Sequence, residues 1–308
     1  MRRYYYSIRN YQPADSDAYI QLNRELDKLE TSEQYFSTRV LTEDMGSPNY
    51  SAEQDLFIAE TDNTIVGYVN VTAEVKIGRV ILNCQIHPAH RGKALSTRLM
   101  ERAMHRARGL GAKVAHVNVQ EDNTMARIVL SKLGFEFVRR FLQLRLDISE
   151  VCCHHSNRTH LTYRHLQHDE KDKLAKAQNY FFADTWGYNP NTSEDISHVI
   201  NVTGCSLEDI IITWDGDRII GYCWTRKIHN VTSDEKRGQI YMLGVDPEYC
   251  GQGTGKAILF AGMSHLKSKG LQVAELTVDS ENEAACALYF SAGFKVEKES
   301  LWYEKVID

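Results

Sequence analysis

The first half of the chain shows a helical pattern of apolar positions followed by strand-like runs. Within 8–30, apolar residues recur at a spacing that places them on one side of an α-helix: Tyr19, Leu22, Leu26 and Leu29. Three runs rich in Val and Ile then have the length and composition of strands: 56–60, 65–75 and 79–86. A loop from His87 leads into a second helical pattern. This order predicts a sheet flanked by helices.

The second half predicts the same elements in the same order. A helical pattern at 170–182 is followed by three strand-like runs: 209–214, 218–226 and 239–245. The last run enters a glycine-dense turn, Cys250 to Lys256, and a long apolar helical pattern then ends at Gly270. This stretch therefore predicts a strand, a loop and a helix in direct succession.

The two halves are copies of one sequence pattern. Pro88 and Pro247 are 159 positions apart, and the same separation relates six further pairs: Gly92 and Gly251, Met104 and Met263, Gly111 and Gly270, Val119 and Val278, Asn123 and Asn282, Gly134 and Gly293. Upstream, Ile65 and Ile219 match at 154 positions, so the second half carries five extra residues before its loop. The chain is a tandem duplication. We expect one domain at 1–150, a linker at 151–160 and a second domain at 161–308.

Composition and charge exclude several classes of function. The chain has 308 residues, enough for two domains, with 43% hydrophobic and 25% charged residues. A net charge of −5 argues against a general nucleic-acid or membrane-surface binder. The first residues lack the apolar core of a signal peptide, and no stretch approaches 18 apolar residues. We expect a cytoplasmic protein, monomeric or homodimeric, with no nucleic acid or membrane partner.

Cysteine and histidine usage does not predict a disulfide framework or a metal site. The seven cysteines are odd in number and lie within predicted strands and helices as well as between them. Cys152, Cys153, His154 and His155 are adjacent and lack the C-x-x-C or H-x-x-x-H spacing that closes a tetrahedral site. A solvated linker is the favoured interpretation, and no metal is expected.

The glycine-dense turn has the chemistry of a phosphate site. Glycines at 251, 253 and 255 allow close approach of the backbone, so that consecutive N–H groups can converge at the start of the following helix. The Walker pattern fails because Cys250 replaces its first glycine and Ala257 follows Lys256. The dinucleotide fingerprint fails because the spacing is G-x-G-x-G.

Two motifs resemble those of the GCN5-related N-acetyltransferase (GNAT) family. Residues 250–255, Cys-Gly-Gln-Gly-Thr-Gly, resemble the family's loop Q/R-x-x-G-x-G/A, with Cys in its first place. Residues 282–294 resemble its second signature, N-x-x-A-x-x-L-Y-x-x-x-G-F. The resemblance implies an α/β (α+β) fold: two tandem GNAT domains, each a mixed, largely antiparallel central sheet flanked by helices. It also implies acetyl-CoA as co-substrate and an amine as acceptor.

The same resemblance implies roles for particular residues in the second copy. Tyr289 would be the general acid toward the departing thiolate of CoA. The strand edge at Leu243, Gly244 and Val245 would bind the pantetheine arm, and Asn282 would contact it. The backbone of the loop would hold the pyrophosphate: Cys250, Gly251, Gln252, Gly253, Thr254, Gly255 and Lys256. Cys250 is not expected to be a nucleophile, because no paired base lies near it in sequence.

The first copy lacks parts of this site. Leu130 is the partner of Tyr289, and leucine cannot donate a proton. Ala94 and Ser96 replace Gly253 and Gly255, which should hinder backbone approach to a pyrophosphate. Four basic residues in or after this loop could hold a CoA phosphate or form a solvated helix face, the favoured interpretation: Arg91, Lys93, Arg98 and Arg102. We expect a degenerate N-terminal domain; whether its loop, Arg91 to Thr97, binds CoA stays open.

The tandem layout and the segment 182–187 resemble the mycothiol synthases, two-domain members of the family that acetylate a cysteinyl amine. Their general base is a glutamate at the start of the core strand, where this chain has Gln239. Weak alternatives for the base are Tyr241, Glu235 and Asp246, or a chain of water molecules. Two other carboxylates, Glu275 and Asp279, are expected to be solvated. The segment 182–187 is either aromatic packing at a helix end or a wall of the acceptor pocket.

Three functional hypotheses follow. The leading one is an acetyl-CoA-dependent N-acetyltransferase for the primary amine of a small molecule, with direct attack of the amine on the thioester. The second is a non-catalytic acyl-CoA-binding or regulatory protein, because Gln239 replaces the base. The third is an acetyltransferase that acts on protein N-termini.

Overall fold

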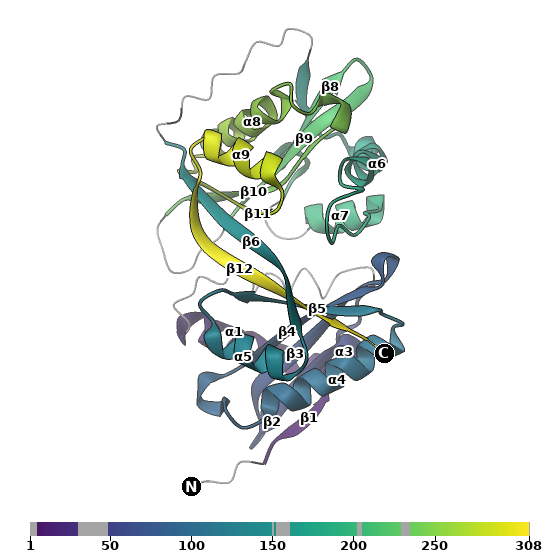
Figure 1. The fold of residues 1–308 in the computed structure, drawn as a ribbon, viewed down its shortest axis with the longest axis vertical. Coiled ribbons are helices and arrows are strands. Elements are labelled where there is room, and N and C mark those ends of the chain that lie inside the picture. The colour runs from purple at the N-terminus through teal and green to yellow at the C-terminus, as the bar shows by residue number, and fades with distance from the viewer. Residues whose placement is uncertain are drawn as a thin grey trace. The chain divides into compact units, whose positions relative to one another are not determined.

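Both halves of the sequence contribute residues to each of the two units that form this protein in the computed structural model (Figure 1). The structure describes residues 5–29, 49–149, 151, 161–201, 205–228 and 235–307. Unit 1 spans Met1–Val138 together with Leu301–Asp308, and unit 2 spans Arg139–Ser300. Residues 152–160, most of the predicted linker, lie outside the described residues. The division at 150 and 161 stays a prediction.

Unit 1 is a sheet with strand order β1-β2-β3-β4-β5-β12. Its strands are β1 (Ser7–Asn10), β2 (Leu56–Thr61), β3 (Thr64–Glu74), β4 (Arg79–Ile86), β5 (Val114–Gln120) and the end of β12 (Lys295–Val306). Its helices are η1 (Pro13–Asp15), α1 (Ser16–Leu29), α3 (Ala52–Asp55), η2 (Val75–Ile77), η3 (Pro88–His90), α4 (Leu95–Gly109) and α5 (Thr124–Lys132). Strands β1 to β4 pair with one another in antiparallel fashion, and β4 pairs with β5 in parallel.

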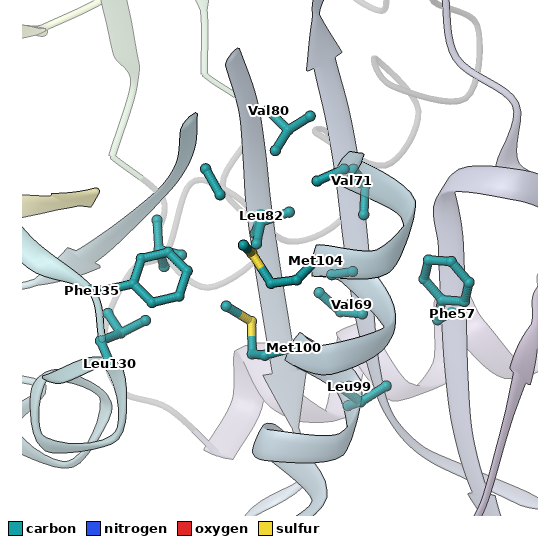
Figure 2. Close-up of a cluster of buried hydrophobic side chains, with 14 of the residues drawn as sticks. Phe57, Val69, Val71, Val80, Leu82, Leu99, Met100, Met104, Leu130 and Phe135 are labelled. Atoms are coloured by element: carbon teal, nitrogen blue, oxygen red, sulfur yellow. The ribbon is translucent and has the colours of Figure 1, made fainter. Parts of the chain in front are cut away.

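Alternating side chains of the unit 1 strands bury two apolar clusters on opposite faces of the sheet. Val69 and Val71 lie in the cluster that α4 and α5 cover, together with Leu130 and Phe135 (Figure 2). Tyr68, the residue before Val69, instead packs with Tyr19 and other residues of α1. The apolar pattern therefore placed these elements correctly, except that Leu29 at the end of α1 is exposed.

Unit 2 repeats the plan with strand order β6-β11-β10-β9-β8-β7. Its strands are the part of β6 (Glu136–Asp147) that follows Val138, then β7 (Thr162–His165), β8 (Ile210–Asp215), β9 (Arg218–Lys227), β10 (Arg237–Val245) and β11 (Val273–Asp279). Its helices are η4 (His168–Glu170), α6 (Lys171–Phe181), α7 (Ser193–Asn201), η5 (Leu207–Asp209), η6 (Pro247–Tyr249), α8 (Thr254–Ser268) and α9 (Glu283–Ser291).

The helices of unit 2 cover both faces of its sheet. Cys223 of β9 faces the cluster formed with α8 and α9, whereas Tyr222 and Trp224 on either side of it face α6 and α7. Gly262 on α8 allows this close packing, because a Cβ there would lie 2.2 Å from the Cys223 sulfur. The face under α8 and α9 is the one on which the predicted loop and Tyr289 lie.

Candidate active site

The central strands of unit 2 separate where the sequence predicts the acyl arm to bind. β10 and β11 pair in parallel over only three positions, from Arg237 with Val273 to Gln239 with Glu275. β10 nevertheless continues to Val245, and its last residues pair with β9 on the other side. Within the described strands, one edge of 243–245 therefore has no β-ladder partner. Its N–H and C=O groups are available to an extended ligand that carries amides.

β10 also contains a bulge that β4 of unit 1 lacks. Its pairing with β9 shifts between Ile240 and Met242, so Tyr241 is an additional residue. In unit 1 the corresponding pairing runs without interruption from Gly67 with Ile86 to Glu74 with Arg79. A bulge bends a strand and changes where its following side chains point, and such bulges are common beside active sites.

The bulge could not be located from the sequence without knowing which residues pair between neighbouring strands. The parallel pair of unit 1 is Arg79 with Val114, and that of unit 2 is Arg237 with Val273. Val273 follows Val114 by 159 positions, whereas Arg237 follows Arg79 by 158. One of the five extra residues of the second half therefore lies within β10 itself.

The glycine loop joins the end of β10 to α8. Asp246 caps η6 by accepting a hydrogen bond from the Glu248 N–H (3.0 Å), and Arg218 holds the same carboxylate at 2.6 Å. Gly251 and Gly253 have φ of +72° and +81°, a left-handed backbone that favours glycine. α8 begins at Thr254, so N–H groups of its first turn have no intrahelical acceptor and can bind an anion.

α9 lies against the start of α8, which brings the two sequence motifs together. A Cβ at Gly255 would lie 3.4 Å from Leu288 of α9 and 3.5 Å from Val245 of β10. Asn282 caps α9 through a hydrogen bond from the Ala285 N–H (3.1 Å), which accounts for an asparagine here without a ligand. Its predicted contact with the CoA arm stays a prediction.

Tyr289 follows Leu288 on α9 and is almost completely buried. Its ring packs edge-on against Phe294, with centroids 5.9 Å apart. Within the described part of the chain, no hydrogen bond to the Tyr289 hydroxyl is present. Burial raises the pKa of this phenol above its ordinary value, so it carries its proton at neutral pH. A protonated phenol is therefore held in the apolar cluster of unit 2, on the helix whose preceding residue, Leu288, packs against the start of α8.

An aromatic cluster covers the other side of β10 at Gly244. A Cβ at this position would lie 2.5 Å from Tyr222, 3.0 Å from Phe182 and 3.1 Å from Phe181. Tyr188 stacks on Phe182 with centroids 5.3 Å apart, and burial raises its pKa to about 12. Phe182 thus packs on the face of β10 at Gly244, and the interpretation of segment 182–187 as a wall of the acceptor pocket stays a prediction.

Trp186, in the same segment, points elsewhere. Its ring lies 6.0 Å from that of Phe141 on β6, and the Arg139 guanidinium lies over it at 5.2 Å. Both aromatic residues of the segment therefore make packing contacts, Phe182 on the face of β10 and Trp186 against β6.

Gln239 and the alternative candidates for the general base contact arginine side chains. The side-chain oxygen of Gln239 accepts a hydrogen bond from Arg226 Nε at 2.6 Å, and the Arg226 guanidinium also covers the Tyr241 ring at 4.2 Å. Asp246 is 1% exposed and paired with Arg218.

Glu235 and Glu275 belong to an arginine cluster at the start of β10. Burial favours the neutral form of Glu235, but hydrogen bonds from Arg145 and Arg237 dominate and lower its pKa. Glu275 is 2% exposed and lies 3.5 Å from Arg237, so the expectation that it is solvated was wrong. It is buried because arginines distant in sequence lie beside it. Asp279 is half-buried and lies 3.7 Å from Arg139.

Comparison with known proteins decides the family. The model of the Acetyltransferase (GNAT) family matches the chain twice, over residues 21–135 and 177–294. The chain belongs to this family. Two matches confirm the tandem GNAT domains, the mixed sheet flanked by helices and the assignment as an N-acetyltransferase that the sequence predicted.

Relatives and solved structures extend the likeness over most of the chain. The mycothiol acetyltransferase of Amycolatopsis mediterranei is 27% identical, over 80% of this chain and 82% of that protein. That of Kocuria rhizophila is 46% identical over 82 residues, 26% of this chain and 27% of that protein. The fold matches a GCN5-related N-acetyltransferase from Sphaerobacter thermophilus (TM-score 0.75, 19% identity, 98% and 96% of the two chains). It also matches a tandem GNAT protein from the clavulanic acid biosynthesis pathway (TM-score 0.76, 10% identity, 99% of each chain).

The first GNAT copy retains the path of the loop. Gly92 has φ of +72°, and Ala94 takes a left-handed conformation (φ +56°) like its partner Gly253. The backbone is thus preserved at a steric cost of about 1–2 kcal/mol for the alanine, and the hindrance to a pyrophosphate stays a prediction. Arg91 and Lys93 donate to the carbonyls of Ile86 (3.0 Å) and Ala89 (3.1 Å), so they hold the loop.

The partner of Tyr289 in this copy is a core residue. Leu130 lies beside Phe135 in the unit 1 cluster, and no hydroxyl occupies its place (Figure 2). Among the described residues, no group of three or more His, Cys, Asp or Glu is placed to hold a metal ion; Cys152 to His155 and His160 lie outside them. A helix long and apolar enough to span a membrane was not found in the described part of the chain.

Proposed function

We propose that unit 2 transfers the acetyl group of acetyl-CoA to the primary amine of a small molecule, by direct attack of the amine on the thioester. The observation that carries this proposal is the separation of β10 from β11 directly before a glycine loop at a helix N-terminus. An extended strand edge and an anion-binding turn in succession suit a ligand with amides at one end and a diphosphate at the other.

The residues of unit 2 would divide the work as follows. The free edge at Leu243, Gly244 and Val245 binds the amide-bearing arm, and a backbone N–H there stabilises the oxyanion that forms at the thioester carbon. The loop from Cys250 to Lys256 holds the pyrophosphate through its N–H groups. Tyr289 donates its proton to the departing thiolate, since its raised pKa keeps it protonated.

The lack of a general base at position 239 indicates which class of amine unit 2 would accept. Gln239 cannot accept a proton at useful pH, and the nearby carboxylates are held by arginines. A lysine-like amine is neutral in only about one molecule in a thousand at pH 7.5, whereas an α-amino group is neutral in about a third. We infer an acceptor of α-amino basicity, deprotonated through water. Because relatives are named mycothiol acetyltransferases, the mycothiol precursor is the first acceptor to test.

The test is thiol release from acetyl-CoA over a panel of amines whose pKa values run from about 7.5 to 10.5. We expect turnover concentrated on the amines of low pKa, and a large loss in Tyr289→Phe on the same amines. A wild-type rate equal to that of Tyr289→Phe on every amine would instead support a non-catalytic acyl-CoA-binding protein. Label from acetyl-CoA found only on polypeptides in a cell extract would support a protein N-acetyltransferase.

A further inference from the structure

The last strand of each sequence half lies in the unit that holds the other half's site motifs. β6, from the first half, pairs with β11 in unit 2, where the Ile148 N–H donates to the Gln272 carbonyl at 2.8 Å. In unit 1 the Ile307 N–H after β12 donates to the Lys113 carbonyl at 2.9 Å. Ile148 and Ile307 are 159 positions apart, as are Lys113 and Gln272. The two strand junctions therefore have the same register.

Each junction pairs an acidic with a basic side chain, and the two are exchanged between the strands of the two copies. Burial lowers the pKa of His116, so its contact with Glu304 at neutral pH is a hydrogen bond to a carboxylate. In unit 1, His116 Nε2 of β5 lies 2.8 Å from Glu304 Oε2 of β12. In unit 2, Glu275 of β11 faces Arg145 of β6 in the strand register, with 3.9 Å between their charged atoms. His116 and Glu275 occupy equivalent positions, 159 apart, and so do Arg145 and Glu304. Between the copies, the acid and the base have changed strands.

The alternative is that each half keeps its own last strand, which would mismatch the acidic and basic side chains of the two junctions. In the common register, His116 would then face Arg145, with the Arg79 guanidinium already 3.5 Å from the imidazole. Glu275 would face Glu304 in a site where the Glu275 side chain is only 3% exposed. Two carboxylates in a poorly hydrated site repel strongly, and His116 would lose the carboxylate to which it is hydrogen-bonded, so this arrangement is disfavoured even though its backbone could form.

A hydrogen bond outside the charge pairs favours the same arrangement. Arg127 Nε donates to the Tyr303 hydroxyl at 3.3 Å within unit 1. The equivalent of Tyr303 in the first half is Leu144, which has no acceptor and instead fills the apolar cluster of unit 2. A first half that kept its own strand would lose this bond as well.

We propose that the charges at positions 116, 145, 275 and 304 select the strand partner, so that each terminal strand completes the sheet of the other half. The partner surfaces are the edges of β5 and β11, and the occupants are β12 and β6 of the same chain. Opposite charge admits one strand, and like charge rejects the other.

Competition between two possible disulfides in the full chain shows whether β6 pairs with β11 or with β5. Gln143 faces Thr277 in the observed register and would face Asn118, the equivalent of Thr277, if the first half kept its strand. A reporter chain with Asn118→Cys, Gln143→Cys and Thr277→Cys is oxidised, and the disulfides of the monomer band are mapped by mass spectrometry. With native charges we expect position 143 to be linked to 277. A link to 118, or a 143–277 link found only between two chains, would overturn the proposal.

Two charge variants of this reporter test the selection. His116→Glu with Glu304→Arg gives unit 1 the pair of charges that unit 2 already carries beside Arg237, a glutamate on the inner strand and an arginine on the last strand. A glutamate then faces an arginine at both junctions in the observed arrangement, and equally in the alternative arrangement. We expect the 143–118 product to increase at least about tenfold relative to 143–277. Arg145→Glu with Glu304→Arg matches only the alternative and should make 143–118 the main product.

The control keeps every sign, with Arg145→Lys and Glu304→Asp, and should give the native disulfide. If 143–277 remains the only product in His116→Glu with Glu304→Arg, charge does not select the partner and the proposal fails. The variant with His116→Glu and Glu304→Arg decides the matter even if the fully reversed chain does not fold, because in the observed arrangement it places an acid opposite an arginine at both junctions.

Discussion

Replacing Tyr289 by Phe removes one hydroxyl from the site and leaves the packing intact. The ring is buried against Phe294, and the hydroxyl has no hydrogen-bond partner in the described part of the chain. Deleting an unpaired hydroxyl should change the free energy of unfolding little, within about 0.5 kcal/mol. Under the proposed mechanism, the substitution therefore affects only proton donation to the departing thiolate.

The expected loss follows from the role of a positioned general acid. Such a group contributes about 10²–10⁴ in rate, which corresponds to about 3–5 kcal/mol of transition-state stabilisation. Because burial raises the pKa of Tyr289, the wild-type rate should show no loss from its ionisation between pH 7 and 10. In the variant, turnover should decrease by a similar factor across this range, since no other donor replaces the phenol.

The assay is steady-state thiol release with the best amine, beside calorimetric binding of CoA and thermal unfolding. We expect kcat to decrease by the factor above while CoA affinity and the midpoint of unfolding stay close to wild type. Tyr289→Leu, which introduces the residue of the first copy, should lose the same activity and also about 1–3 kcal/mol of stability through lost ring packing. A Phe variant with kcat within twofold of wild type would refute the assignment of Tyr289 as the acid.

Three further outcomes are expected. Gly253→Val should abolish CoA binding by unit 2, because valine cannot readily take φ of +81°, whereas Ala94→Val at the equivalent position should leave calorimetric binding by unit 2 unchanged. Gln239→Glu should supply a base and raise kcat/KM for amines of high pKa, as measured by the amine panel at pH 7.5. Glu170→Gln should lower the free energy of unfolding by about 1–3 kcal/mol at pH 7. The Arg164 hydrogen bond lowers the pKa of Glu170, so this stabilisation is present above the ordinary glutamate pKa and is lost as pH falls through the lowered value, which thermal melts from pH 7 to 3 would show.

The sequence predicted those parts of the site that depend on local pattern. A separation of 159 positions aligned Gly253 with Ala94 and Tyr289 with Leu130, and glycine spacing placed the loop at the start of α8. These features follow from residues adjacent along the chain, where backbone conformation and helical periodicity act. The left-handed backbone conformation of Ala94 could not be predicted from its residue type, because tertiary packing overrides the preference of alanine for negative φ.

Features that depend on strand register escaped prediction. Tyr241 looks like any other residue of an apolar strand, and only the pairing of β10 with β9 shows it to be additional. Glu275 looks like a solvated carboxylate until Arg237 and Arg145 are placed beside it by two different strands. The position of β6 beside β11 likewise depends on partners more than 100 residues apart, which composition and periodicity do not encode.

That placement of β6 means that unit 2, the proposed catalytic unit, depends on the first half of the chain. β6 and the residue after it place Leu144 and Ile148 in the unit 2 cluster, both with no exposed surface. Burying two such side chains contributes about 3–6 kcal/mol, a large part of the 5–15 kcal/mol typical of a whole domain. A chain of residues 161–308 also leaves the edge of β11, the strand from which β10 separates at the proposed acyl site, without its partner. We therefore expect this truncated chain to show no cooperative thermal unfolding and no thiol release, and co-expression with residues 1–150 to restore both. Wild-type activity from residues 161–308 alone would show that β6 is dispensable for the site.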